Sequence, residues 1–221
     1  MKLLLTSAGV KNASIRTTLV DLLGKRIEEC TALCVPTAAY AMSGGPGAAW
    51  RQISGRASTP MSDLGWKSLG VLELTALPSL DADLWVPLVQ ETDALLVGGG
   101  DALYLAHWMR ESGLADLFPS LRDTVYLGVS GGSMAMAPQV GEEFVGWKPP
   151  AGGDAGLGVV DFAMFPHLDH PDLPENSMAD AEQWAAALSV PGYALDDQTA
   201  LTVVDGAVDV ISEGNWRLFT P

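Results

Sequence analysis

Cysteine is nearly absent from this sequence of 221 residues, which contains only Cys30 and Cys34. Two cysteines are too few for a disulfide framework or for a four-ligand zinc site. Both fall in one strand-like apolar segment, where residues four apart lie about 13 Å from each other, too far for a disulfide. We therefore expect two buried, free thiols.

Cationic residues are also scarce, since 12 Lys and Arg stand against 27 Asp and Glu, for a formal net charge of −15. A negative field of this size repels phosphate backbones and anionic lipid surfaces. The composition therefore argues against nucleic acid or a membrane surface as a partner, and solubility explains the excess of acid.

Long hydrophobic runs are missing as well, because no uninterrupted apolar stretch reaches the ~20 residues of a membrane span. The N-terminal MKLLLTSAGVKN is too short for a signal-peptide core and has no cleavage-site pattern. We expect it to be a first β-strand, and the protein to be soluble and cytoplasmic. Apolar residues still make up 48% of the chain and charged residues 18%, which excludes intrinsic disorder.

Short apolar runs alternate with segments of helical periodicity. The runs that fit buried strands cover residues 2–8, 31–37, 68–77, 94–97 and 125–129, and the helical segments cover residues 14–25, 81–91, 102–112 and 178–189. This alternation is typical of an α/β fold, with a mostly parallel sheet sandwiched by helices. Right-handed crossovers then bring the carboxyl ends of the strands to one edge, where ligands bind such sheets.

The C-terminal part predicts a β-hairpin, because the apolar runs 192–206 and 207–219 meet at Asp205-Gly206. Two Gly-rich segments stay open: residues 37–60 fit a loop or a simple connection, and residues 146–158 fit a long ordered loop or a short hairpin. The chain shows neither repeat nor linker, so we expect residues 1–221 to form one domain.

The stretch TVYLGVSGGSMAM joins a buried-type strand to a serine flanked by small residues. The spacing predicts a nucleophile elbow at Ser130, where side chains at Gly128 and Gly132 would clash. Such a turn aims backbone N–H groups at an oxyanion beside the serine. An ordinary Gly-rich turn and a phosphate site are the alternatives.

A second apolar strand, in DALLVGGGDALYL, ends in three glycines before a helix capped by Asp101. Glycine lets the backbone approach a ligand closely, so an N–H in this turn could be the other oxyanion donor. The stretch lacks the Lys-Ser/Thr of a P-loop and the spacing of a dinucleotide fingerprint. A tight turn or half of a nucleotide-binding loop would also explain it.

Two of the three histidines lie in FAMFPHLDHP. His167 follows an apolar run and a proline, at a strand end from which a general base could reach Ser130. His170, with nearby carboxylates, could instead form a metal site with His167. We interpret His107, in the helix after the three glycines, as a surface or packing residue.

Two adjacent carboxylates, Asp196 and Asp197, interrupt the apolar stretch GYALDDQTALTVV. Carboxylates are costly there unless they serve a purpose, and one of them could orient His167. A β-turn would also explain them. Glu142 or Glu143, after the elbow helix, could supply the acid instead.

In this order, the stretches VGGGDALYL, LGVSGGSMA, FPHLD and LDDQTAL resemble the serine peptidases of the peptidase E (α-aspartyl dipeptidase) and cyanophycinase type. The resemblance implies that Ser130 is the nucleophile, His167 its general base and Asp197 the acid. It assigns the oxyanion N–H groups to Gly99 and Gly131. It also implies a class I glutamine amidotransferase-like fold, with Ser in place of Cys, and no metal or organic cofactor.

The sequence departs from the family's pattern at three places. The elbow has Ser-Gly-Gly where the family has Ser-Ala-Gly, and the glycine turn has Gly-Gly-Asp where the family has Gly-Gly-Asn. The helix after Pro-His, SMADAEQWAAAL, lacks the arginine that recognises an aspartate side chain in aspartyl dipeptidases. The nearest upstream cations, Lys148, Arg110 and Arg122, do not match its position.

We therefore predict a serine peptidase that cleaves dipeptides or other small peptides, without assured Asp-X specificity. A related peptidase for Gly-, Ala- or Ser-containing peptides, an acyl hydrolase, and a non-catalytic binding protein of the same fold are the alternatives. A small peptide is the expected partner, and the oligomeric state stays open, with a homodimer among the options.

Overall fold

The computed structural model describes all 221 residues and contains a seven-stranded main sheet of order β3-β2-β4-β5-β1-β8-β9. Its strands are β1 (Lys2–Thr6), β2 (Thr31–Val35), β3 (Ser68–Val71), β4 (Ala94–Val97), β5 (Val125–Val129), β8 (Thr199–Val204) and β9 (Ala207–Ser212). The first five strands are parallel, β8 runs antiparallel to its neighbour β1, and β9 pairs antiparallel with β8 and so returns to the direction of the first five. The predicted mostly parallel sheet is confirmed.

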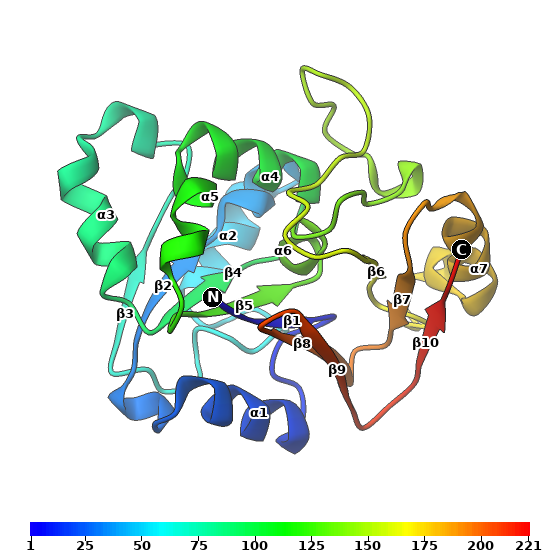
Figure 1. Ribbon diagram of the computed structural model, residues 1–221, viewed down its shortest axis with the longest axis horizontal. Helices are drawn as coiled ribbons and strands as arrows, with labels where there is room; N and C mark the ends of the chain where they lie inside the picture. Colours follow the sequence, from blue (N-terminus) through cyan, green and yellow to red (C-terminus); the bar gives the residue numbers. More distant parts are fainter.

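Helices cover both faces of this sheet (Figure 1). Helix α1 (Ala13–Leu23) lies on one face, and α3 (Ala82–Gln90), α4 (Ala102–Glu111) and α5 (Leu114–Leu117) lie on the other. None of the helices is both long and apolar enough to cross a membrane. The sandwich of helices and sheet expected from the alternating periodicity is therefore present.

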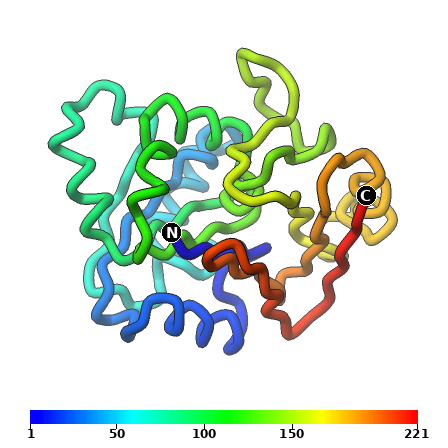
Figure 2. Tube along the Cα trace, viewed as in Figure 1, coloured from blue at the N-terminus to red at the C-terminus, as the bar shows by residue number.

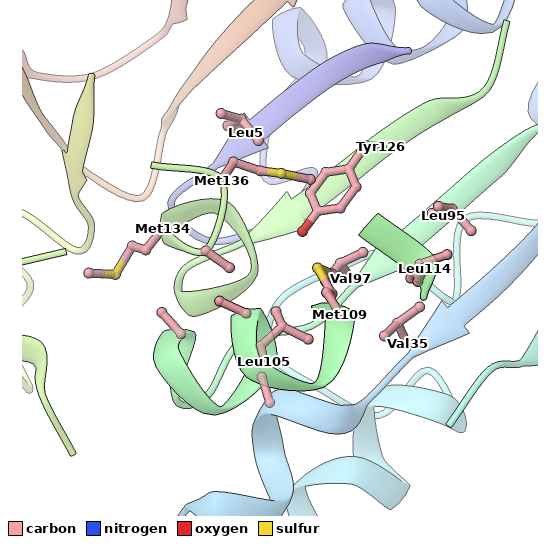
Figure 3. Close-up of a cluster of buried hydrophobic side chains, with 14 of the residues drawn as sticks. Leu5, Val35, Leu95, Val97, Leu105, Met109, Leu114, Tyr126, Met134 and Met136 are labelled. Carbon is pink, nitrogen blue, oxygen red and sulfur yellow. The ribbon is translucent and has the colours of Figure 1, made fainter. Parts of the chain in front are cut away.

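The core is divided by the period of two along each strand. In β1, Leu3 and Leu5 join the buried cluster under α3 and α4, whereas Leu4 joins the cluster under α1. Figure 3 shows the first cluster, in which Tyr126 of β5 lies near Met109 of α4. Because both faces are buried, these strands appear in the sequence as continuous apolar runs.

A second, three-stranded sheet lies beside the main one, at the right of Figure 1. It consists of β6 (Ala163–Phe165), β7 (Gly192–Leu195) and β10 (Trp216–Phe219), and helix α7 (Met178–Ala187) packs against it. The buried Trp184 of α7 stacks edge-on against Phe165. This sheet was not predicted from the sequence, because each C-terminal apolar run contributes one strand to each sheet.

The predicted hairpin is confirmed between β8 and β9, where Asp205 and Gly206 have φ of 50° and 82°. Residues 146–158 form a protruding loop without strands (Figure 2). The strand expected over residues 68–77 ends at Val71, before a turn that leads to α3.

Residues 37–60 are more regular than a loop. They form the 3-10 helix η2 (Thr37–Ala41) and helix α2 (Gly45–Ile53), which pack on each other beside the carboxyl edge of the sheet. The two cysteines are buried and free, as expected, and burial raises the pKa of the Cys34 thiol to about 11.

Candidate active site

Ser130 lies on the sharp turn between β5 and the short helix α6 (Gly131–Met134). Its φ of 49° and ψ of −117° fall in a region that residues with a side chain rarely occupy. The Ser130 N–H donates to the Thr6 carbonyl at 3.0 Å, and the Met134 N–H donates to the Ser130 carbonyl at 2.9 Å. This is the strained strand-to-helix geometry of a nucleophile elbow.

Glycines make this turn sterically feasible. A Cβ atom at Gly128 would lie 3.0 Å from the Gly132 carbonyl oxygen, and one at Gly132 would lie 2.3 Å from the Val97 carbonyl oxygen. The predicted clashes at these two positions are therefore present. A Cβ atom at Gly131 would lie 2.1 Å from the Gly100 carbonyl oxygen, which explains why this chain has Ser-Gly-Gly at its elbow.

His167 follows β6 and Pro166 and turns its ring toward the elbow. Its Nε2 lies 3.0 Å from Ser130 Oγ, within hydrogen-bond distance. The side chain is 19% exposed, and the backbone has a φ of 58°, in the left-handed region. His167 can therefore accept the Ser130 proton directly.

Asp197 lies in the turn between β7 and β8 and contacts the other ring nitrogen of His167. Its Oδ1 is 2.7 Å from His167 Nδ1, and its Oδ2 is 3.6 Å from His170 Nε2. Burial works to raise the pKa of Asp197, but the hydrogen bond from His167 and the electrostatic influence of His167, His170 and Lys11 hold this pKa below its usual value. The ionised carboxylate accepts the Nδ1–H and leaves Nε2 free to act as a base.

The other candidate acids have different partners. Asp196 Oδ1 accepts from the Gln198 N–H at 3.0 Å and from Thr199 Oγ1 at 2.7 Å, so this carboxylate stabilises the turn itself. Glu142 and Glu143 lie in the 3-10 helix η5 (Glu142–Phe144) and make no ion pair with a histidine. Of the four, only Asp197 contacts His167.

The backbones of Gly99 and Gly131 both lie next to Ser130. The turn after β4 comes so close that a Cβ atom at Gly99 would lie 3.3 Å from Ser130 Cβ. The Gly99 N–H donates no hydrogen bond within the chain, and the Gly131 N–H begins α6, where a helix leaves its first amides without an intrahelical acceptor. Both positions expected to form an oxyanion hole are therefore next to the serine.

The carboxylate of Asp101, in the Gly-Gly-Asp turn, accepts hydrogen bonds from two backbone amides. Its Oδ1 accepts from the Tyr104 N–H at 2.8 Å and caps α4, and its Oδ2 accepts from the Trp147 N–H at 2.5 Å. The carboxylate does not line the space beside Ser130. This departure from the family's pattern therefore stabilises the fold.

A pocket of about 280 Å³ opens beside Ser130 and His167. One side of it comes from η2, α2 and the residues that follow, the segment that the sequence left open. Arg51 is the one cation in its lining, Gln52 adds a carboxamide, and no Asp or Glu takes part. In a chain of net charge −15, such a pocket favours a ligand with a neutral or negatively charged group.

The sequence model described as Peptidase family S51 matches residues 3–211. The chain belongs to peptidase family S51. No curated protein matches it in sequence.

Two solved structures resemble this S51 chain. A Listeria monocytogenes EGD-e protein provisionally described as peptidase E has a TM-score of 0.68 at 16% identity, over 96% of this chain and 98% of that one. A peptidase from an acI-B1 Actinobacterium also has a TM-score of 0.68, at 18% identity, over 99% of this chain and 93% of that one. At these identities the likeness shows a shared α/β fold, and family membership supports a peptidase.

The cations considered for substrate recognition in this S51 chain lie away from its pocket. Lys148 lines a different cavity of about 500 Å³ with Glu142. Arg110 donates to the Gly156 carbonyl and lines another concavity, of about 710 Å³, which also includes Met1, just before β1. Arg122 is exposed just before β5, at the end opposite Ser130.

The remaining histidines have structural surroundings. His170 Nδ1 accepts from the Asp172 N–H at 3.1 Å, and its Nε2 faces Asp197. His107 packs against Trp147, with ring centroids 5.0 Å apart. The structure places no three His, Cys, Asp or Glu residues where they could hold a metal ion together, and both ring nitrogens of His167 have partners among Ser130 and Asp197.

Two residues at this site escaped the sequence analysis. Arg51 lies in a Gly-rich segment without strong periodicity, so nothing indicated that it would line the pocket. Ser7 follows β1, and its hydroxyl lies 2.7 Å from the His167 backbone nitrogen and 3.4 Å from Asp197 Oδ1. A polar residue at the carboxyl end of a central strand was the available signal for Ser7.

Proposed function

We propose that this S51 chain is a serine peptidase that hydrolyses small peptides. Ser130 is the nucleophile, His167 the general base and Asp197 the acid that orients it. The observation that carries the proposal is the continuous chain of contacts from Ser130 Oγ to His167 Nε2, at 3.0 Å, and from Nδ1 to Asp197, at 2.7 Å.

The proposed reaction begins when Ser130 Oγ attacks the scissile carbonyl carbon and its proton passes to His167 Nε2. The carbonyl electrons move onto oxygen, where the Gly99 and Gly131 N–H groups stabilise the charge. The C–N bond then breaks, and the leaving amine takes the proton from His167. A water molecule then attacks the acyl-enzyme and gives a proton to His167. The carboxylic acid product leaves as the bond to Ser130 Oγ breaks, and His167 returns the proton to Ser130 Oγ.

The pocket supports a small substrate. A volume of about 280 Å³ accommodates one or two amino-acid residues beside Ser130. Arg51 offers a guanidinium that could pair with a carboxylate, either an acidic side chain or the C-terminal carboxylate of a short peptide. Asp-X dipeptides remain candidate substrates, with the cation supplied by α2 in place of the helix after Pro-His.

Free-amine release from a dipeptide panel tests the proposal. The panel compares Asp-X with Asn-X, Ala-X, Gly-X and Ser-X, each with a free and with an amidated C-terminus. We expect hydrolysis by the wild type, and a loss on the order of 10⁴-fold in Ser130→Ala with the fold preserved. Substantial turnover by Ser130→Ala would refute the nucleophile assignment.

The role of Arg51 is measured on the same panel. Arg51→Ala should reduce hydrolysis of the carboxylate-bearing peptides about tenfold or more and leave their amide counterparts nearly unchanged. Arg122→Ala removes the same charge at the opposite end of β5 and is the matched control. Equal effects of Arg51→Ala and Arg122→Ala would show that only net charge is involved.

A further inference from the structure

Ser7 lies where the two parts of the proposed catalytic site meet. It follows β1, which pairs on one side with β5, the strand that ends before Ser130, and on the other side with β8, the strand that begins after Asp197. The Ser7 N–H donates to the Thr199 carbonyl at 3.3 Å, and the Thr6 carbonyl accepts from the Ser130 N–H at 3.0 Å. The end of β1 is therefore tied to both the nucleophile and the turn that carries the acid.

The Ser7 hydroxyl contacts both His167 and Asp197. The His167 backbone N–H donates to Ser7 Oγ, with the two atoms 2.7 Å apart, and Ser7 Oγ lies 3.4 Å from Asp197 Oδ1. Because an amide can only donate, Oγ is the acceptor in the first contact and its own proton remains for the carboxylate. One hydroxyl thus joins the backbone of the base to the side chain of the acid.

Two further observations indicate that this contact holds His167 in place. Ser7 is fully buried, where a hydroxyl is retained only when it is hydrogen-bonded. His167 has a φ of 58°, a conformation that a residue with a Cβ atom keeps only when its surroundings hold it. The bond to Ser7 Oγ fixes the N–H of that strained residue.

We propose that Ser7 is a positioning residue of this peptidase, which holds the His167 backbone and shares the charge of Asp197. The inference rests on the proposed function of the triad. Ser7 lines no part of the pocket, so it acts through His167 and Asp197 and keeps Nε2 aimed at Ser130.

The pH dependence of the reaction should report this role. Three other charged or titratable groups face the pair: His170 and Lys11 act on Asp197, and Arg51 lines the pocket that reaches His167. Without the Ser7 proton, more of the Asp197 charge is directed at His167, and the protonated imidazole is favoured. Because attack requires the neutral imidazole, the acid limb of the profile in Ser7→Ala should move to higher pH.

The test is the rate at which a diphenyl phosphonate labels the full-length protein, followed by mass spectrometry across a range of pH. The Ser130 Oγ–P bond forms, phenoxide leaves, and the hydroxyl proton passes to His167. We expect Ser7→Ala to be labelled about 10- to 100-fold more slowly than the wild type. Thr124→Val, which removes another buried hydroxyl at the far end of β5, should be labelled at the wild-type rate.

A rate for Ser7→Ala within about twofold of the wild type, or an acid limb that does not move, would overturn the inference. If Ser7→Ala fails to fold by circular dichroism, Ser7→Cys decides, because a thiol of similar size is a weaker donor. Slower labelling of Ser7→Cys supports the inference, and an unchanged rate overturns it. A wild type that is not labelled at Ser130 would instead refute the proposed function.

Discussion

Neighbouring residues Asp196 and Asp197 have opposite roles, although they are chemically identical. Asp196 accepts hydrogen bonds from its own turn and from the Asn215 N–H, whereas Asp197 faces His167 and His170. The turn between β7 and β8 sends the two side chains to different surroundings. The first of the pair supports the local fold, and the second is available for the proposed chemistry.

Asp197→Asn should therefore affect turnover far more than stability. An amide cannot stabilise the imidazolium and lets His167 adopt the tautomer with its proton on Nε2, so kcat should fall on the order of 10⁴-fold. Amine release and a melting curve on the same sample measure both effects. Asp196→Asn is the matched control, and it should lower Tm without a comparable loss of kcat. Equal losses of kcat in both variants would contradict the assignment of the acid.

Gly131→Ala tests the steric argument at the elbow. The new Cβ atom would lie 2.1 Å from the Gly100 carbonyl oxygen, so the two glycine turns would have to separate. We expect a loss of about 1–3 kcal/mol in stability and of about tenfold or more in phosphonate labelling, because the Gly99 N–H moves away.

The control for that substitution is Gly70→Ala on the edge strand β3, where the close contact of the Cβ atom, at 2.7 Å, is with the movable end of the Leu33 side chain. It should label at the wild-type rate. Full labelling of Gly131→Ala would show that the elbow tolerates the alanine after all.

The three residues of the proposed triad could be singled out from the sequence because each lies in a short local pattern. Ser130 is flanked by glycines after an apolar strand, and His167 and Asp197 follow strands of their own. Ser7 and Arg51 were not predicted, since the contacts of Ser7 depend on long-range pairing of β1 with β5 and β8, and those of Arg51 depend on the folding of residues 37–60 into helices. Local patterns point to the proposed reacting groups, whereas the residues around them depend on topology.

At the scale of elements, Asp197 lies where the chain passes from the small sheet to the main sheet. Strand β7 belongs to the small sheet and β8 to the main one, so the chain passes from one sheet to the other through Asp196 and Asp197. A sequence pattern of two apolar runs does not show which sheet each strand joins. The sequence therefore predicted the hairpin at Asp205 correctly and missed the second sheet.

Asp93 connects the segments at the ends of α1, β2 and β4, and its contacts predict how stability depends on pH. Asp93 forms an ion pair with Lys25 at 2.7 Å and accepts from the Thr31 N–H at 2.7 Å. Burial works to raise the pKa of Asp93, but the bonds from Lys25 and Thr31 hold it below its usual value. A carboxylate with a lowered folded-state pKa stabilises the protein above its unfolded pKa of about 3.9, and this contribution is lost as pH falls through the folded value.

Asp93→Asn should therefore destabilise the protein at neutral pH and flatten the loss of stability below about pH 4. Urea unfolding at a series of pH values measures this, with Asp83→Asn on the exposed face of α3 as the control. If the free energy of unfolding of Asp93→Asn depended on pH as that of the wild type does, the proposed contribution of the Asp93 carboxylate would be contradicted.

For the whole molecule, the net charge of −15 has a physical consequence. Only three Lys or Arg side chains form ion pairs, with Asp93, Glu29 and Glu182. Most carboxylates therefore repel one another across the surface, which destabilises the compact state. Salt screens such repulsion over a Debye length of about 8–10 Å near physiological ionic strength.

Addition of sodium chloride should accordingly raise Tm by a few degrees between about 10 and 300 mM at neutral pH. Differential scanning fluorimetry measures the change in Tm, with the buffer and its pH held constant while the sodium chloride concentration is varied. Tm that falls with salt would mean that the few ion pairs outweigh the general repulsion.

The central place of β1 makes the order of synthesis matter. Strand β1 is synthesised before both of its neighbours in the sheet, β5 and β8, and Ser130 is translated before Asp197. At typical elongation rates of about 5–20 residues per second, the interval from Ser130 to Asp197 lasts about 3–13 s. During that interval a nascent chain carries the proposed nucleophile without the proposed acid, so hydrolysis by the proposed triad would have to wait for synthesis of Asp197 and strand β8.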